Sequence, residues 1–573
     1  MKYLNKLFLV LLLGFTLSSC DDLTELDLLD NPNAVTPDLA GVDFLYNNIQ
    51  LQFRNLHNGF HFDAEGLVRY TTMGAFTYNN AITPVTGNGE WTTTYAGLFP
   101  DMDALIALTQ ERGLNVYEGN TLVMKAYVMT TMVDMFGNIP YSEAGQGTDI
   151  ISPTADEGSA IYAEADAILD QAIALLEQGG ATPVVDIYYN GSTSNWITLA
   201  KTMKLRNALS TRLTNSGAGG TISSIVSGGD LIDQNSEDFV FQYGVERNQP
   251  PSRHPFYNNH YEAGDGTYMG NYVMWSMCCE KEVDGAPLVD PRIRYYFYRQ
   301  VPNSLNQDVN VYSCVLSDRP DDPGTYPAHY TAVDPRLPYC VASADGYYGR
   351  DHGNGSGIPP DGFIRTVYGL YPGGGRWDGN TFGNVQNNGV DGGLGRGIMP
   401  IITASSVDFM RAEAALTAGT GEDARALLES GVRKSISKVL DFASVSPNDF
   451  AETVFDPIEG VDVPRGDVFG VSSDDVEAYV AYVLDAFDNA SDQLDVVMKE
   501  AYIARWGNAV ETFNAYRRTG KPNNMQPGVD ALSIDDFPKS FLLPANHVNQ
   551  NANVTQKSIY DLVFWDNGSA QTR

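Results

Sequence analysis

The hydrophobic positions of the first third recur at helical spacing. Across residues 38–213 apolar side chains return every three or four residues, which places them on one face of a helix. One such face spans residues 123–130 and stops at "FGNIP" (136–140), where glycine can adopt a left-handed cap and proline prevents continuation. Similar spacing over 161–175 and 196–203 predicts further helices, so this third is expected to form antiparallel helix pairs.

The last third repeats this pattern. A helix is expected to begin at Ser405, which can cap its first turn with Asp408 completing a capping box, and to end at Gly419. One further helix is expected to carry the apolar positions of 497–513 and to end at the "TGKP" of 519–522. Helical hairpins of roughly 34 residues fit the tetratricopeptide class. No two segments are similar enough to establish a repeat.

The middle of the chain is different. Residues 341–400 hold 17 of the 55 glycines, and residues 243–371 hold 16 of the 32 tyrosines. Such glycine density breaks helices and favours loops with short strands. We therefore predict a mainly α fold, a tetratricopeptide-like helical hairpin scaffold with a large irregular, loop-rich insertion containing short strands. One domain is expected over 38–573, with a scaffold of 38–216 and 401–573 and a loop-rich, ligand-binding half of 217–400.

Composition narrows the class of protein. The 573 residues carry a formal charge of −35, which repels nucleic acid and anionic lipid surfaces. Charged residues make up only 19% and apolar residues 43%, so the chain has ample material for a core. Nucleic-acid binding is excluded, and a large globular protein is expected.

The first residues have the pattern of a secretory leader. Lys2 and Lys6 precede an apolar run that is too short to span a bilayer, and the run ends at "LSSC". This predicts a signal peptide over 1–19, a lipidated Cys20 and a tether over 20–37, with the lipid as the only membrane anchor. A buried structural cysteine is the alternative. Four acids follow, as a solvated tether or as a signal for export to the outer face of the outer membrane: Asp21, Asp22, Glu25 and Asp27.

The other four cysteines leave several pairings open. Their even number in an exported chain allows one or two disulfides, with Cys314 to Cys340 preferred. Free buried thiols are the alternative. The spacing matches no zinc site, and the adjacent Cys278 and Cys279 lack the two intervening residues of a redox motif.

No catalytic or metal-binding motif stands out. The chain has no Gly-x-Ser-x-Gly elbow, phosphate loop or HExxH helix, and nothing selects one carboxylate pair among its 71 acids. No cofactor is therefore expected, and the residues alone indicate no particular enzyme activity. Four aspartates leave a structural calcium ion open, although a solvated turn is favoured: Asp318, Asp321, Asp322 and Asp334.

Six stretches in a fixed order resemble the SusD/RagB family of surface lipoproteins. They extend over nearly the whole chain: "MFGNIPYSEA" (135–144), "WITLAKTMKLRNALS" (196–210), "DPRIRYY" (290–296), "SSVDFMRAEAAL" (405–416), "ARWGNAVETFNAYRRTG" (504–520) and "FLLPANHVNQNANV" (541–554). The resemblance implies a non-enzymatic, lipid-anchored protein that faces the cell exterior on the outer membrane. Such a protein captures oligosaccharides or peptides and passes them to a SusC-like TonB-dependent barrel.

The candidate ligand residues come from three loops. Aromatic rings suit sugar faces, or peptide side chains, and the polar groups would bind hydroxyls. Packing in the core is the alternative for each ring, and an internal ion pair is the alternative for the last three residues. The candidates are Tyr78, Asn79 and Asn80; Tyr268, Tyr272 and Trp275; and Tyr347, Tyr348, Arg350, Asp351 and His352. Two other functions remain open, a surface glycan hydrolase and a non-catalytic adhesin or assembly scaffold.

Overall fold

The structure is a computed structural model that describes residues 41–264, 266–304, 326–354, 364–457, 460–529 and 536–568. The predicted signal peptide, Cys20 and the tether lie outside these residues. Within them, no helix combines the length and the apolar character needed to cross a bilayer.

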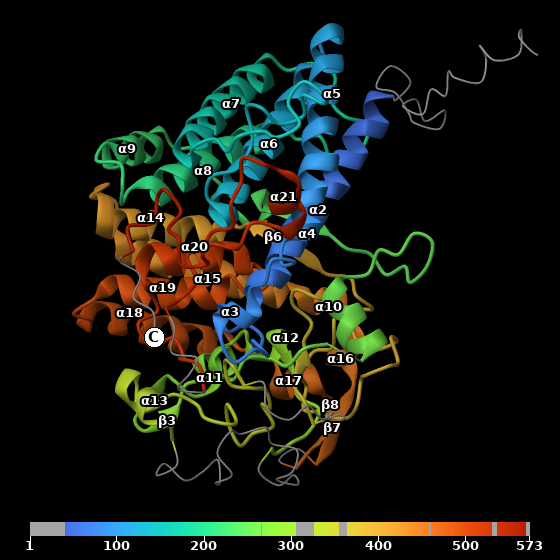
Figure 1. The fold of residues 1–573 in the computed structure, drawn as a ribbon. Helices are drawn as coiled ribbons and strands as arrows, with labels where there is room; N and C mark the ends of the chain where they lie inside the picture. Colours follow the sequence, from blue (N-terminus) through green and yellow to red (C-terminus); the bar gives the residue numbers. More distant parts are fainter. Residues whose placement is uncertain are drawn as a thin grey trace, which may run out of the picture.

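The first third forms the predicted helical layer. Its helices are α2 (Val42–Glu65), α5 (Phe99–Arg112), α6 (Asn115–Phe136), α7 (Gly158–Gln178), α8 (Thr193–Thr211) and α9 (Ala218–Gly228). Helix α6 packs against α5 and α7, and α7 packs against α8, so neighbouring helices form antiparallel hairpins. Figure 1 shows this layer at the top, with α2 running down beside it towards the irregular half. The helix expected to stop at "FGNIP" does so, because Gly137 has a φ of 79°.

The last third supplies the second set of hairpins. Its helices are α14 (Ala404–Ala418), α15 (Ala424–Leu440), α18 (Ser473–Asn489), α19 (Gln493–Ala504), α20 (Ala509–Thr519) and α21 (Ala545–Gln550). Helix α14 packs against α15 and α19, and α15 packs against α18. The predicted ends at Gly419 and Gly520 are confirmed, with φ of 67° at both. Both layers together confirm the predicted fold class.

Two local predictions in this third are wrong. The N-cap of α14 is Thr403, whose side chain accepts a hydrogen bond from the Ser406 backbone, while Asp408 is buried and bonds Ser430 instead. The single helix expected over 497–513 is two helices, α19 and α20. Gly507 lies between them with a φ of 93°, which interrupts the helix, and the Asn508 side chain caps α20.

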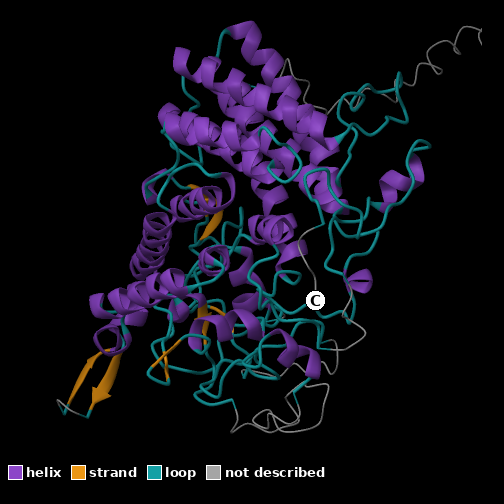
Figure 2. Ribbon diagram, turned by 90° about the vertical axis from the view of Figure 1, so that its left-hand side faces the viewer, coloured by secondary structure: helices purple, strands orange, loops and turns teal. Residues whose placement is uncertain are grey.

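The middle consists of loops, short helices and short strands, as predicted. Short helices occur in the middle, after α2 and in the last third, where a strand hairpin, β7–β8, also lies. Figure 2 shows that loops make up much of the lower half of the molecule. The helices are α3 (Tyr78–Ala81), α4 (Asn88–Thr93), α10 (Pro255–Tyr257), α11 (Asn271–Cys278), α12 (Ile293–Tyr296), α13 (Ala328–Val333), α16 (Pro447–Ala451) and α17 (Arg465–Phe469). The strands are β1 (Phe239–Gln242), β2 (Glu282–Val283), β3 (Ala286–Pro287), β4 (Phe297–Tyr298), β5 (Val367–Tyr368), β6 (Ile398–Ile402), β7 (Thr453–Asp456) and β8 (Val461–Pro464).

The strands form four antiparallel pairs: β1 with β6, β2 with β3, β4 with β5, and β7 with β8. Phe239 lies opposite Ile402 in the first pair, which joins the middle of the chain to the start of α14. In the third pair Phe297 lies opposite Tyr368. These short ladders hold the loops together without forming an extended sheet.

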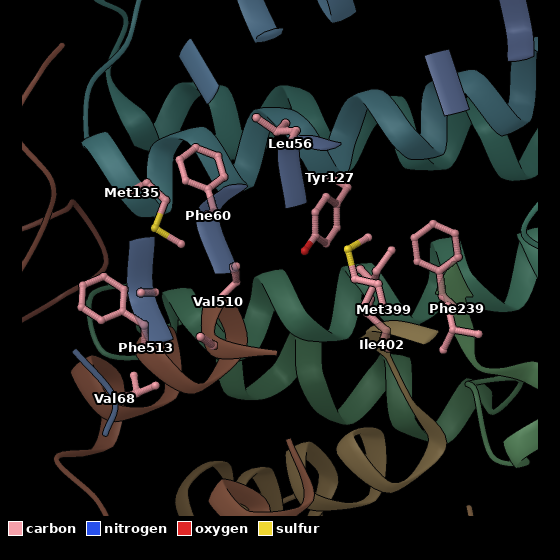
Figure 3. Packing of buried hydrophobic residues seen from close by; sticks show 14 of the residues in the cluster. Leu56, Phe60, Val68, Tyr127, Met135, Phe239, Met399, Ile402, Val510 and Phe513 are labelled. Carbon is pink, nitrogen blue, oxygen red and sulfur yellow. The ribbon is translucent and has the colours of Figure 1, made fainter. Parts of the chain in front are cut away.

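The main core lies where α2 and α6 meet α20 and β6. Figure 3 shows Phe60 of α2 and Met135 of α6 on one side, facing Val510 and Phe513 of α20. All four side chains are buried. Because this core joins both helical layers, α2 is held firmly along its length, and its last turn presents fixed side chains to the irregular half.

A buried carboxylate next to the first family-like stretch joins two of the others, 196–210 and 504–520, to the C-terminal segment. Asp134 of α6 accepts hydrogen bonds from Arg206 Nη2 of α8 at 2.8 Å, Asn514 Nδ2 of α20 at 2.9 Å and Trp565 Nε1 at 2.8 Å. The Tyr162 hydroxyl of α7 donates to the same carboxylate. Asp134 is fully buried, so this network binds the C-terminal segment to both helical layers.

The three cysteines that the structure describes are all disulfide-bonded. Cys278 and Cys279, adjacent at the end of α11, form a disulfide. Cys340 is disulfide-bonded as well, but Cys314 lies outside the described residues. The Cys314–Cys340 pair therefore stays a prediction.

Candidate functional site

A polar groove lies at the C-terminal end of α2. It is about 430 Å³ in volume, and its walls are the last turn of α2, the segment 66–75, the end of α3 with Thr86, and Thr267 from the irregular half. The lining residues with polar side chains are Asp63, Glu65, Thr71, Thr72, Asn80, Thr86 and Thr267. No lysine or arginine is among the lining residues. The groove therefore offers hydroxyl, amide and carboxylate groups to a ligand.

A smaller hollow of about 250 Å³ continues the groove towards the irregular half. It shares Phe62, Glu65 and Thr267 with the first and adds Phe256 and Tyr368 among its walls. The rings of Phe256 and Tyr368 stack with centroids 4.0 Å apart. Phe62 packs edge-on against Phe256 and remains partly exposed. The continuation thus gives the polar groove one accessible aromatic side chain.

The floor of the groove is fixed by hydrogen bonds of Glu65. The Tyr368 hydroxyl donates to Glu65 Oε2 at 3.0 Å, and His61 Nε2 lies 3.2 Å from the same oxygen. His61 is itself held, because the Ala509 backbone donates to its Nδ1 at 3.0 Å. The last turn of α2 is thereby joined to β5 and to the start of α20.

Asp63 is the most perturbed carboxyl group of the groove. Burial, with the nearby charge of Glu90 as a smaller cause, raises the pKa of Asp63 to about 7. Burial also raises the pKa of Glu90. Asp63 Oδ2 is buried and has no hydrogen-bond partner in the described part of the protein. Burying an acceptor without a partner is unfavourable, so a ligand hydroxyl or amide that reached this oxygen would be stabilised by it.

One glycine lets the irregular half approach the groove. Gly270 follows the Thr267 segment, and a Cβ there would lie 2.2 Å from the Arg69 carbonyl oxygen. Its amide donates to the Tyr70 carbonyl at 3.0 Å, and the Thr72 amide donates to the Tyr268 carbonyl at 2.9 Å. A side chain at Gly270 would push Thr267 away from α2.

The first predicted loop reaches the groove. Asn80 lines it and Asn79 is exposed nearby, with its amide 3.2 Å from the Tyr560 hydroxyl. Tyr78 is buried beneath, where its hydroxyl accepts a hydrogen bond from Arg69 Nη2 at 3.0 Å and lies 3.1 Å from His352 Nε2.

The second and third predicted loops meet each other behind the groove. Tyr268 and Tyr348 are buried edge to face, and the Arg350 guanidinium lies 4.3 Å from the Tyr268 ring centroid. Asp351 is buried and accepts hydrogen bonds from the Asn271 side chain at 2.9 Å, the Gln526 side chain at 3.0 Å and the Cys340 backbone at 2.7 Å. Burial raises the pKa of Asp351. These residues support the groove wall in this conformation.

Three predicted residues lie elsewhere. Tyr272 and Trp275 of α11 are buried against α19, and Lys499 Nζ lies 2.8 Å from the Tyr272 hydroxyl. Tyr347 is buried under the Arg299 guanidinium, 4.9 Å from its ring centroid. A ring this buried offers no face to a ligand in this conformation, so the binding role of these residues remains a prediction.

The predicted calcium ligands are only partly described. Asp334 receives two hydrogen bonds from the Arg336 side chain, at 3.1 and 2.8 Å. The other three aspartates, 318, 321 and 322, lie outside the described residues. Within the described ranges, no group of three or more metal-binding side chains occurs.

Sequence reasoning missed Asp63, Glu65 and the threonines of the groove. The only local signal was "FDAEG" (62–66), which places two acids at the end of a helix beside the predicted Asn80 loop. Because the chain has 71 acidic residues, that signal does not distinguish Asp63 and Glu65 from the others. The groove exists because the Thr267 segment, about 200 residues away in sequence, packs against it.

Helical hairpins carrying an irregular half with a polar groove define a scaffold suited to ligand binding. Residues 33–326 match a family model described as starch-binding, associating with the outer membrane, and residues 397–571 match the model of SusD and RagB outer membrane lipoproteins. The chain belongs to the SusD/RagB family, whose proteins bind nutrients such as glycans at the outer membrane and are known as binding proteins.

Solved structures share the fold. A SusD/RagB family protein from Bacteroides thetaiotaomicron is 19% identical, with 92% of this chain and 100% of that chain covered and a TM-score of 0.60. A SusD homologue from Bacteroides ovatus is 19% identical, with 92% and 99% covered and a TM-score of 0.57. A chitin-binding SusD homologue from Flavobacterium johnsoniae is 17% identical, with 89% and 94% covered and a TM-score of 0.52. No curated protein matches the chain.

Proposed function

We propose that this protein captures oligosaccharides in the groove at the end of α2 and releases them unchanged. The observation that carries the proposal is the lining of the groove, where Asp63, Asn80 and four threonines surround one space beside Phe62. A sugar presents many hydroxyl groups and one apolar ring face, and this combination offers partners for both. Oligosaccharides are favoured over peptides because one solved relative is described as chitin-binding.

The captured oligomer would pass to a SusC-like TonB-dependent barrel in the outer membrane. Lipidation of Cys20 after removal of residues 1–19 would anchor the protein there, facing the cell exterior, and residues 20–37 would serve as a tether. Membership of a family of outer-membrane lipoproteins supports this arrangement. Co-purification of the lipidated chain with a large barrel protein tests it, and a chain recovered without acyl groups and without a barrel would contradict it.

The experiment for the groove is a binding screen on the chain that lacks residues 1–20. A panel of oligosaccharides and peptides is measured by isothermal titration calorimetry, first on the wild type and then on Asp63→Asn and Asn80→Ala. We expect one oligosaccharide class to bind and each variant to weaken it at least about threefold. Asn80→Ala removes a polar contact of about 1 kcal/mol, and Asp63→Asn replaces a charged acceptor with a weaker neutral one. Asp170→Asn, on the far end of the scaffold, serves as the control. Unchanged affinity in both groove variants would contradict the proposal.

One observation favours a second function, glycan hydrolysis. A carboxyl group with a pKa of about 7 in a groove, near a second carboxyl, has the character of a general acid. Incubating the protein with each bound saccharide and measuring new reducing ends separates the two functions. We expect none, and turnover that Asp63→Asn abolishes would replace capture with hydrolysis.

A further inference from the structure

The lysines of this acidic protein are almost all neutralised by carboxylates. Of the ten lysines that the structure describes, eight have Nζ within 4.0 Å of a carboxylate oxygen. The ninth, Lys539, is buried. Lys557 is the exception, because no carboxylate oxygen of the described residues lies within that distance of its Nζ.

Lys557 lines a pocket that shares no lining residue with the candidate binding groove. The pocket is about 340 Å³ in volume, and its walls include the end of α6, His547 of α21 and the segment 553–562. In Figure 1 α21 lies in the red C-terminal segment beside α4, and the rings of His547 and Trp91 are 4.5 Å apart there. A Cβ added at Gly137 would lie 3.7 Å from Lys557 Nζ, so the amine faces the glycine turn that ends α6.

The backbone around Lys557 is fixed. The Gln556 side chain accepts hydrogen bonds from the backbone of Lys557 and of Leu543, both at 3.0 Å, and donates to the Leu543 carbonyl at 2.6 Å. The Lys539 amide donates to the Ile559 carbonyl at 2.7 Å. The hydrogen bonds of this backbone therefore position the half-buried amine at the pocket wall. No carboxylate of the described residues forms an ion pair with it.

The surrounding charges favour the neutral amine. Burial and, to a smaller extent, the positive charge of Arg517 on α20 lower the pKa of Lys557 to about 7, and Asp561 opposes them. His547 of α21 also lines the pocket, and burial lowers its pKa as well. At pH 7 about half of such an amine is unprotonated, compared with about 1 in 2,500 for an ordinary lysine.

We propose that Lys557 is a nucleophilic amine that condenses reversibly with small aldehydes entering this pocket. The Nζ lone pair would form a bond to the carbonyl carbon while one proton passes from nitrogen to the carbonyl oxygen, giving a neutral carbinolamine. Its hydroxyl group then takes up a proton from solvent and leaves as water, which gives a protonated imine. One amine, one aldehyde and one proton thus become one protonated imine and one water, and no oxidant or reductant takes part.

Lys125 is a matched internal control. It too is half-buried and lines a pocket, but its Nζ lies 2.6 Å from Asp103 Oδ1. Although burial acts in the opposite direction, the hydrogen bond to Asp103 leaves the pKa of Lys125 raised. The two lysines therefore differ in their pairing while their access to solvent is similar.

The test is reductive trapping of the full chain with glyceraldehyde and cyanoborohydride, followed by peptide mass spectrometry at several pH values. At pH 7 we expect Lys557 to be labelled at least about tenfold faster than Lys125, with a rate that levels off near pH 8. Lys557→Arg should lose this fast site only, and Asp103→Asn should accelerate labelling of Lys125. Equal rates at the two lysines, or a Lys557 rate that keeps rising to pH 10, would overturn the proposal.

Discussion

Replacing Asp134 with alanine should destabilise the protein more than any exposed charge substitution. The side chain is fully buried and accepts hydrogen bonds from Arg206, Asn514, Trp565 and Tyr162. Arg206 would retain only Glu511 as a carboxylate partner. Breaking a buried ion pair costs about 3–5 kcal/mol, and each buried donor left unpaired adds about 1–3 kcal/mol before the structure relaxes.

The expected loss is therefore about 5 kcal/mol, which is a large part of the total stability of an ordinary domain. Urea unfolding followed by far-ultraviolet circular dichroism and tryptophan fluorescence measures it, since Trp565 donates to this carboxylate. Asp134→Asn, which keeps one acceptor oxygen, should lose less. The control is Asp170→Asn on α7, because Asp170 is 65% exposed in its pair with Lys204 and should change stability by under about 1 kcal/mol.

If Asp134→Ala and Asp170→Asn lose similar amounts, below about 1.5 kcal/mol, the reasoning is refuted. The carboxylate would then not hold the C-terminal segment to the two helical layers, and the groove would need another source of rigidity.

Three further predictions concern pH and backbone conformation. The pKa of Asp63 is about 7, so this carboxyl group ionises between pH 6 and 8. Because an ionised carboxylate is the stronger acceptor, affinity for a bound saccharide should rise about three- to tenfold over this range. Calorimetry of Asp63→Asn should show no such rise. Burial lowers the pKa of His57 and His254 to about 3, so the unfolded state binds more protons below pH 6.5. Stability should therefore fall as pH drops from 6.5 to 3, by up to about 1.4 kcal/mol per pH unit for each histidine, and urea midpoints that stay constant over this range would contradict this. Gly507→Ala should lose more than about 1 kcal/mol in the same urea assay, because its φ is 93° and a Cβ would lie 2.7 Å from Pro372 Cγ; a neutral effect would show that the break between α19 and α20 does not require glycine.

Much of the helical scaffold follows from local sequence signals. Glycine followed by a proline marks the end of α6, and glycine marks the ends of α14 and α20, because only a few residues decide whether a helix continues. The failures are local features decided by packing. Thr403 caps α14 because β6 ends directly before it. Asp408 instead accepts a hydrogen bond from the Ser430 hydroxyl on α15.

The site was harder to predict than the scaffold. Core packing was the alternative for each candidate ring, and 14 of the 15 tyrosines that the structure describes between 243 and 371 are buried. Which polar groups face the groove depends on the approach of Thr267 to the end of α2, and no periodicity encodes a contact between segments so distant in sequence. Asn80 was a candidate because it stands with Asn79 beside Tyr78 in an expected loop, where a ring and polar groups together suit a sugar. Asp63 looked like any other surface acid.

The most direct test of the central claim is a crystal structure of the chain lacking residues 1–20, soaked with the tightest saccharide from the binding screen. We predict intact saccharide in the groove at the end of α2, in contact with Asp63, Asn80 and Thr267. Intact saccharide bound elsewhere with the groove empty, or cleaved product in the groove, would contradict the claim.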